Sequence, residues 1–408
     1  MKELKIAFMI TLLQYFALVT PEAAKISDNV RRDKVPVIFA TGSHYNIGYD
    51  VGRTFSSMIK NFISLNERLR EFEAEYKTEK GRQAYDTTLA NMKKRYPYYV
   101  NEIQGTADGA EVPFYQLFLL QMDDIIETIN DSVMTRNDTG GCSSIAINNP
   151  RTTILGHTED AFSETLNHFY ILSAHVIPTP EDKAKGATEE RFASLCYAGQ
   201  LPGYTMGYTE QGLVFSINTL SPKVLKPGNT PRTFLTRAML AASSKVQLEK
   251  ILLDPGLGTA NGFSVNTIWT NQDGERKLYN VEVAPDYNND KSVVNVQKFD
   301  KWDALIHCNR YEHVKLPEVK GPIIDSSVAR LAALRAYNTP KSRRDVETMI
   351  SDQSGSNYLV FQDRDQAIVK TIAAGIFDLD RGTWNIFIKK PNSSEPVAVL
   401  PITFSMLK

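Results

Sequence analysis

One pentapeptide, Gly140-Gly141-Cys142-Ser143-Ser144, combines residue types that can make and then use a nucleophile. Two glycines permit backbone conformations that other residues resist, and a thiol beside them can attack the peptide bond before it. If the bond between Gly141 and Cys142 breaks, Cys142 gains a free α-amine next to its own thiol. The pentapeptide therefore predicts a nucleophile and its base on a single residue.

A thiol and an α-amine titrate within about one pH unit of each other, slightly above neutrality. The amine can therefore take the thiol proton and later return one to a leaving amine. Such a site needs no histidine, and none of the six histidines has an obvious pairing with Cys142. The alternative is that Cys142 is a buried structural cysteine that follows a glycine turn.

The pattern of apolar residues changes at Cys142. Residues 25–128 are predicted to be mainly helical, and the polar stretch 128–139 to be a surface loop. From Cys142 onward short strands alternate with turns, and helices interrupt them. This order predicts an α+β fold in which two sheets pack between helices. Individual predictions include a turn at 42–48, helices at 51–72, 80–95, 233–242 and 328–337, and a strand at 358–362.

Length, composition and charge limit the partners and cofactors that we expect. The chain has 408 residues, a formal net charge of -1 and 42% hydrophobic residues. It can bury a large core, and no partner among nucleic acids or anionic membranes is expected. Nucleotide-binding fingerprints are absent, so no cofactor is predicted. Cys196 and Cys308 either pair in a disulfide or are two buried thiols.

The amino terminus has the layout of a targeting segment. Lys2 and Lys5 precede an apolar run over 6–19, and Pro21 follows it. This pattern predicts a secretory signal peptide over 1–24. The run is short for a membrane span, which needs about 20 residues, so no stable membrane insertion is expected. Secretion is therefore predicted, with a membrane anchor or a cytoplasmic protein as the alternatives.

Several segments together resemble the penicillin-acyltransferase-like branch of the N-terminal-nucleophile hydrolases. They are the glycine-containing stretch 42–52, the stretch 102–110 with the apolar run 117–120 after it, and the sequence Gly-Cys-Ser-Ser at Cys142. The resemblance implies a four-layer αββα sandwich made as an inactive precursor. Cleavage at Gly141–Cys142 would give a helical α chain, 25–141, and a β chain, 142–408.

The resemblance also implies partners for Cys142. Asp160 lies 18 residues further on (160 − 142), after one predicted hairpin, and corresponds to the family's aspartate that orients the new α-ammonium group. Arg330 resembles the family's late catalytic arginine, which would favour the thiolate. Arg310, which follows a predicted strand, is its rival.

Two asparagines are candidates for stabilising an oxyanion. Asn261 resembles the family's oxyanion-hole asparagine, although Asn-Gly is also an ordinary turn signal. Asn218 matches a second site position. The histidines at 157, 168 and 175 fit no metal-binding spacing and are predicted to be strand histidines with local hydrogen bonds, so no metal is predicted.

Within the branch, the segments 53–56 and 156–160 are most similar to hydrolases of β-alanyl amides of biogenic amines, such as β-alanyl-dopamine and β-alanyl-histamine. The implied reaction runs through a thioester on Cys142. The alternatives are an acyltransferase, an amidase for other N-acyl amines, and an unprocessed binding protein. Candidate partners for the substrate ammonium are Asp123, Asp124, Glu127 and Glu159, and candidate aromatic walls are Tyr204, Tyr208 and Phe215.

Overall fold

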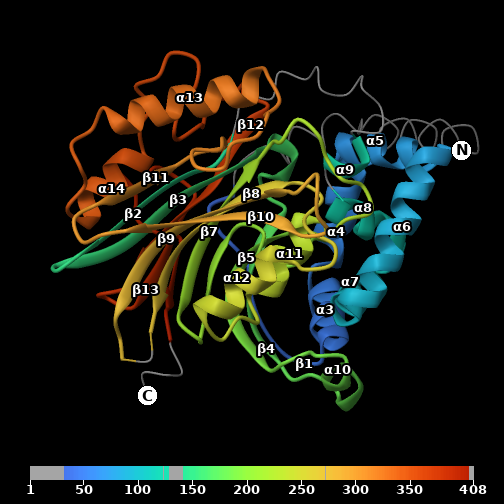
Figure 1. Ribbon diagram of the computed structural model, residues 1–408. Helices are drawn as coiled ribbons and strands as arrows, with labels where there is room; N and C mark the ends of the chain where they lie inside the picture. Colours follow the sequence, from blue (N-terminus) through green and yellow to red (C-terminus); the bar gives the residue numbers. More distant parts are fainter. Residues whose placement is uncertain (1–31, 123, 128–140, 272, 404–408) are drawn as a thin grey trace, which may run out of the picture.

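The computed structural model describes residues 32–122, 124–127, 141–271 and 273–403, and Figure 1 shows their arrangement. The predicted signal segment, 1–24, and the predicted loop, 128–139, lie outside these residues. None of the described helices is both long enough and apolar enough to cross a membrane. Two sheets and several helices confirm the α+β class that the sequence predicts.

Among the described residues before Cys142 helices dominate, and the one strand there was missed by the sequence analysis. The predicted turn at 42–48 is wrong after its first residues, because the Ser43 side chain accepts a hydrogen bond from the Asn46 N–H and starts a helix at His44. The elements of this segment are β1 (Val37–Gly42), α3 (His44–Thr54), α4 (Ser56–Leu65), α5 (Glu67–Tyr76), α6 (Glu79–Arg95), α7 (Pro97–Ala110), α8 (Phe114–Met122) and α9 (Asp124–Glu127).

The larger sheet has eight strands in the order β1-β4-β5-β6-β7-β8-β9-β10, and the smaller has six in the order β11-β2-β3-β12-β13-β14. The predicted strand at 358–362 is wrong, because this buried apolar segment packs in the core without strand pairing. The strands are β2 (Ser143–Asn149), β3 (Thr152–Phe162), β4 (Phe169–Val176), β5 (Glu190–Tyr197), β6 (Met206–Thr209), β7 (Leu213–Leu220), β8 (Gly262–Thr270), β9 (Arg276–Pro285), β10 (Ser292–Phe299), β11 (Ala304–His307), β12 (Val369–Asp378), β13 (Thr383–Phe387) and β14 (Ala398–Pro401).

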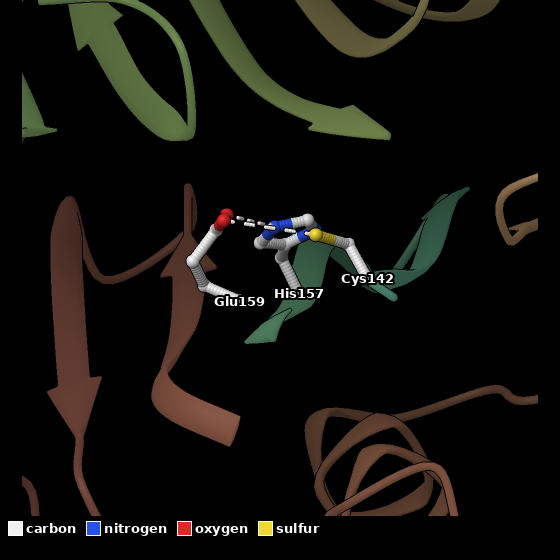
Figure 2. Close-up of side chains that lie close together, drawn as sticks. All are labelled: Cys142, His157 and Glu159. Carbon is white, nitrogen blue, oxygen red and sulfur yellow. Dashed lines mark hydrogen bonds and ion pairs between the residues drawn. The ribbon is translucent and has the colours of Figure 1, made fainter. Parts of the chain in front are cut away.

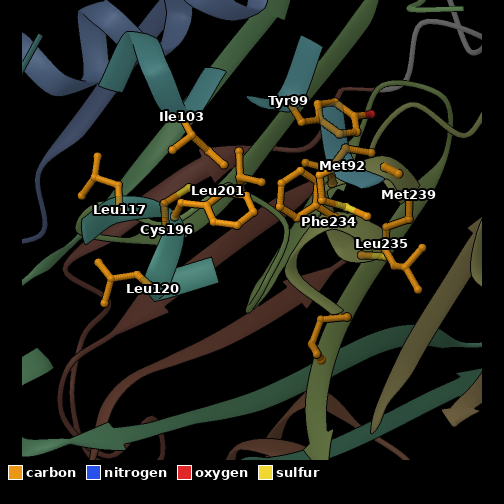
Figure 3. Packing of buried hydrophobic residues seen from close by; sticks show 14 of the residues in the cluster. Met92, Tyr99, Ile103, Leu117, Leu120, Cys196, Leu201, Phe234, Leu235 and Met239 are labelled. Atoms are coloured by element: carbon orange, nitrogen blue, oxygen red, sulfur yellow. The ribbon is translucent and has the colours of Figure 1, made fainter. Parts of the chain in front are cut away.

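Four apolar clusters hold the described elements together, and the three larger ones join sheets and helices. One joins the two sheets, for example Leu155 of β3 with Leu195 of β5. Another joins the larger sheet to helices, and Figure 3 shows Ile103 of α7, Cys196 of β5 and Phe234 within it. The third joins the smaller sheet to two late helices. The helices after Cys142 are α10 (Pro180–Ala184), α11 (Arg232–Met239), α12 (Lys245–Leu253), α13 (Pro322–Arg335) and α14 (Arg343–Ile350).

Four glycines let α3 and α7 pack backbone against backbone. Gly48 and Gly52 of α3 lie against α7, and Gly105 and Gly109 of α7 lie against α3. A Cβ atom at any of them would approach a backbone oxygen of the other helix to 2.0–2.2 Å, far inside contact distance. These glycines occur in the segments that carry the family resemblance, so part of that resemblance reflects helix packing.

The hairpin of β2 and β3 brings distant residues back to Cys142. Asn149 closes the turn, because its Oδ1 accepts hydrogen bonds from the N–H groups of Arg151 and Thr152. Ser143 then pairs with Thr158 in an antiparallel register. The predicted hairpin is therefore confirmed, and the residues just after Thr158 lie beside the start of β2.

Candidate active site

Cys142 immediately precedes β2, is 5% exposed and opens onto a cavity of about 220 Å³. The cavity is lined by residues of helices that precede Cys142 in sequence, by Cys142 and residues of the smaller sheet, and by Tyr197 and Thr219 of the larger sheet. Its wall combines carboxylates with aromatic rings, which suits a small ligand that has both a cationic and an aromatic end. Lining residues include Phe62, Phe72, Cys142, Glu159, Asp160, Tyr197, Tyr204 and Arg232.

Polar contacts between side chains form a closed ring that starts at the Cys142 sulfur and returns to the Cys142 carbonyl oxygen. Its Sγ lies 3.7 Å from Glu159 Oε1, and Glu159 Oε2 lies 3.0 Å from His157 Nε2, as Figure 2 shows. His157 Nδ1 lies 2.8 Å from Ser144 Oγ, and Ser144 donates to Asn218 Oδ1 at 3.0 Å. Asn218 Nδ2 donates to the Cys142 carbonyl oxygen at 2.8 Å and closes the ring.

Further donors support this ring. Asn218 uses Nδ2 on a carbonyl oxygen, so its Oδ1 is the acceptor that faces Ser144. Asn266 Nδ2 donates to Ser144 Oγ at 3.0 Å and to Asn218 Oδ1. The Tyr197 hydroxyl donates to Glu159 Oε1. Each polar side chain of the ring therefore has more than one polar contact.

Of the two candidate arginines, the structure brings Arg330 to Cys142. Arg330 is 1% exposed, and its Nη1 donates to the Cys142 carbonyl oxygen and to Ser143 Oγ, both at 2.8 Å. Its Nη2 donates to Asn309 Oδ1 at 2.8 Å. Arg310 instead has a side chain that is 38% exposed and pairs with Glu312.

Burial raises the pKa of the Cys142 thiol well above its usual range. The carboxyl groups of Glu159 and Asp160 raise this pKa further, whereas Arg330 lowers it. In the intact chain the thiol therefore keeps its proton at neutral pH. A nucleophile at this position needs a base that removes that proton.

Asp160 lies next to the cleavage position and is short of partners. Its Oδ1 accepts from Thr371 Oγ1 at 2.6 Å, whereas its buried Oδ2 has no hydrogen-bond partner among the described residues. Burial raises the pKa of Asp160 to about 7, against the opposing effects of Arg330 and Thr371. A buried carboxyl in this state favours the arrival of a cationic group beside it.

The two asparagines differ in what they contact. Asn218 binds the Cys142 carbonyl oxygen directly. Asn261 does not line the cavity, and its Oδ1 accepts from the backbone N–H of Arg232 at 3.0 Å. Its Nδ2 is buried and lacks a hydrogen-bond partner in the described part of the chain. Asn261 Nδ2 is therefore available to donate a hydrogen bond, whereas Asn218 Nδ2 already donates one to Cys142.

Of the three aromatic residues predicted to line the cavity, one does so. Tyr204 lines the cavity, and its hydroxyl accepts from Arg232 Nε at 3.2 Å. Phe215 is fully buried between the larger sheet and the helices, so its predicted place in the cavity wall is wrong. Tyr208 is also absent from the wall, because its hydroxyl donates to the Pro401 carbonyl oxygen at 2.8 Å.

Of the four acidic candidates for binding an ammonium group, the structure describes one side chain. Glu159 lines the cavity beside the sulfur. Asp123 and the side chains of Asp124 and Glu127 lie outside the described part.

Sequence reasoning missed the role of His157 in this cluster. The two-residue spacing of His157 and Glu159 on one strand places both on the same face, which is a signal that the sequence carries. His157 is a strand histidine with local hydrogen bonds, as predicted, but one of its partners belongs to the site. Cys196 and Cys308 are both buried free thiols, which excludes the disulfide alternative.

Comparisons with known proteins identify the family. The family model described as acyl-coenzyme A:6-aminopenicillanic acid acyl-transferase matches residues 147–393. A β-alanyl-dopamine/carcinine hydrolase of Drosophila melanogaster is 42% identical over 379 residues, which cover 92% of this chain and 98% of the relative. Both comparisons confirm the family resemblance that the sequence segments indicate.

Proposed function

This chain belongs to the acyl-coenzyme A:6-aminopenicillanic acid acyl-transferase family, and from that membership we propose that it is a self-cleaving cysteine amidohydrolase. The observation that carries the proposal is the buried Cys142, which opens onto a cavity and has Asp160 and Arg330 beside it. We further propose that the packing of helices on both sheets is the four-layer αββα sandwich. The α chain would be residues 25–141 and the β chain residues 142–408, after removal of a signal peptide over 1–24.

Cleavage would supply the base that the buried thiol lacks. Once the Gly141–Cys142 bond is hydrolysed, the new α-amine of Cys142 takes the thiol proton and becomes an ammonium group. Asp160 Oδ2, which has no hydrogen-bond partner among the described residues, can then accept from it. The pair of opposite charges favours both the carboxylate and the ammonium, and Arg330 favours the thiolate.

The same groups support amide hydrolysis. The thiolate attacks the substrate carbonyl carbon, and a donor must stabilise the oxyanion. Asn261 Nδ2 is a buried donor with no partner in the described structure, and it would serve if the Asn261 side chain turned toward the cavity, which it does not line here. As the C–N bond breaks, the α-ammonium gives its proton to the leaving amine, and a thioester remains. The α-amine then removes a proton from water, which attacks the thioester and releases the acid and the thiol.

The substrate we propose is a β-alanyl amide of a biogenic amine, as in β-alanyl-dopamine or β-alanyl-histamine. The hydrolase from Drosophila melanogaster carries β-alanyl-dopamine and carcinine in its name. In such a substrate two methylene groups separate the carbonyl carbon from the ammonium. Glu159, whose Oε1 lies 3.7 Å from the Cys142 sulfur, is close enough to bind that ammonium. Phe72 and Tyr204 in the cavity wall provide apolar surface for the aromatic half.

A matched pair of substrates tests this assignment. We expect the enzyme to release β-alanine from β-alanyl-dopamine, and Glu159→Gln to lower kcat/KM at least about tenfold, since a charge-assisted hydrogen bond contributes ~1.5–3 kcal/mol. On propionyl-dopamine, which lacks the ammonium, the same variant should lose clearly less. Equal losses on the two substrates would show that Glu159 does not recognise the ammonium.

Acyl transfer is the second candidate, because the matching family is described as an acyl-transferase. The thioester is common to both reactions, and an amine would replace water as the second nucleophile. Incubation with the substrate and a second amine separates them: a new amide indicates transfer, and free β-alanine indicates hydrolysis.

A further inference from the structure

We propose that Cys142, His157 and Glu159 form a binding site for a thiophilic divalent cation such as Zn²⁺, and that this cation inhibits the enzyme reversibly. One sulfur, one imidazole nitrogen and one carboxylate oxygen lie within 4.8 Å of one another, and all three residues are buried. Figure 2 shows these atoms converging from two neighbouring segments of the chain. Sulfur, nitrogen and oxygen are the ligand types that zinc takes in proteins, commonly with three protein ligands and a water.

The donor atoms are close enough to share a tetrahedral ion once the Glu159 carboxylate turns. Bonds of ~2.3 Å to sulfur and ~2.0–2.2 Å to nitrogen or oxygen at the tetrahedral angle place sulfur and oxygen about 3.6 Å apart, and nitrogen and oxygen about 3.4 Å apart. The observed separations are 3.7 Å from Cys142 Sγ to Glu159 Oε1 and 3.0 Å from His157 Nε2 to Glu159 Oε2, so the sulfur and the imidazole contact different carboxylate oxygens. To bind an ion through one oxygen, Glu159 would turn that oxygen toward both other ligands, which already lie within 4.8 Å of it.

The surrounding hydrogen bonds already orient the ligands. His157 Nδ1 lies 2.8 Å from Ser144 Oγ, and Nε2 is directed at Glu159. Metal-binding histidines usually have this kind of support on the second ring nitrogen. The Tyr197 hydroxyl holds the Glu159 carboxylate in the same way. A cation would take the place of the direct contact between His157 Nε2 and Glu159 Oε2 and would displace the proton on the thiol.

Charge and access also favour a dication. A thiolate at Cys142 and the carboxylate of Glu159 would give the ion two negatively charged ligands, which matches the charge of a dication. Cys142 and Glu159 both line the cavity, so an ion can reach them from the same side as the substrate.

The inhibition, unlike the binding, rests on the proposed function. A bound cation would occupy the nucleophilic sulfur and the carboxylate to which we assign the substrate ammonium. It should therefore compete with β-alanyl substrates and raise their KM, and a chelator should restore activity.

Cobalt titration of the purified full-length protein tests the site without substrate. Under nitrogen, Co²⁺ should bind once per chain and give the near-ultraviolet absorption of a cobalt thiolate. We expect His157→Gln to weaken Co²⁺ at least about tenfold, since even supporting residues of metal sites contribute ~10–100-fold. His175→Gln is the matched control, because His175 pairs with Glu189 at 2.7 Å in another part of the molecule. It should bind Co²⁺ as the wild type does.

A wild-type protein without the thiolate absorption, or His157→Gln with unchanged affinity, would overturn the proposal. If His157→Gln fails to fold, Glu159→Gln removes a different ligand and should weaken Co²⁺ similarly. The two proposals fail separately. A protein that shows the cobalt signal but hydrolyses no amide keeps the metal site and loses the function, and the reverse result keeps the function alone.

Discussion

Two buried clusters in this molecule contain the same kinds of residue and behave in opposite ways. The Arg237 cluster consists of Arg237, Glu102, Glu190 and His44. Arg237 donates to Glu102 Oε2 at 2.8 Å and to Glu190 Oε2 at 2.6 Å, and His44 Nδ1 lies 2.8 Å from Glu102 Oε2. The Cys142 cluster likewise has an arginine, a histidine and two carboxyl groups, and it also contains the thiol.

The difference lies in how well the charges are matched. Burial alone would raise the pKa of Glu102, but Arg237 and His44 hold this pKa below its usual value. In the Cys142 cluster burial prevails and raises the pKa of Asp160 to about 7. The Arg237 cluster is sealed in the core and fixes ions in place. The Cys142 cluster faces a cavity and contains a carboxyl group whose pKa lies near neutrality, which suits acid–base chemistry.

Position in the sequence gives the Arg237 cluster its importance. Glu102 and His44 precede Cys142, whereas Glu190 and Arg237 follow it. In a cleaved enzyme this cluster would therefore connect the α chain to the β chain. The comparison predicts that changes in the Arg237 cluster alter stability, and that changes in the Cys142 cluster alter chemistry.

The largest effect is expected from Arg237→Ala. It leaves two buried carboxylates without their cation, and breaking a buried pair in this way costs about 3–5 kcal/mol. Denaturant unfolding should show this loss of free energy of unfolding. Arg53→Ala is the control, because Arg53 forms an exposed pair with Asp50. It should change stability by less than about 1 kcal/mol. Equal stability of the two variants would contradict the view that the Arg237 cluster holds the fold.

Arg330→Ala should act mainly on chemistry. Loss of its hydrogen bonds to the Cys142 carbonyl oxygen and to Ser143 should slow both cleavage and amide hydrolysis by about 10²-fold or more, as loss of a preorganised donor does. Gel analysis and kcat/KM measure the two rates. Arg310→Ala, which removes the half-exposed rival, should retain activity within about twofold. If Arg310→Ala lost more activity than Arg330→Ala, Arg310 would be the arginine of the active site.

A smaller effect should appear in the pH dependence of stability. In a Cys142→Ala chain, which we expect to stay intact, the folded pKa of Asp160 is above its unfolded value because burial, the main cause, persists. Its contribution to stability is therefore fully present below about pH 4 and is lost as the pH rises to about 7. Between pH 5 and pH 7 the chain should lose about 2 kcal/mol more than its Asp160→Asn counterpart. If the free energy of unfolding of the two proteins changed with pH in the same way, burial would not raise the pKa of Asp160.

Local sequence patterns predicted much of the candidate site. The turn at Asn149 fixes the register of β2 and β3, so the spacing of Asp160 from Cys142 was enough to place them together. Strand alternation would also have excluded Phe215, because it and Asn218 are an odd number of residues apart on β7 and so face opposite sides. The resemblance favoured Arg330 over Arg310, but no local pattern separates the two arginines, since their positions depend on how α13 packs against the sheet.

Non-local packing also explains the errors in the fold. β1 was missed because a short strand in a helical segment is stabilised by its parallel pairing with β4, more than 130 residues away. The segment 358–362 has the apolar character of a strand, but its burial comes from packing against α14 and the smaller sheet. In both cases the deciding partner is remote in the sequence.

Intact-mass analysis of the purified protein, followed by amino-terminal sequencing, tests the central claim most directly. We expect two fragments from the wild type, the second starting with Cys-Ser-Ser at Cys142, and one uncut, inactive chain from Cys142→Ala. Cys196→Ala should be cut normally, because Cys196 is buried in the core away from the cavity. A wild-type protein that hydrolyses amides as a single uncut chain would contradict the account.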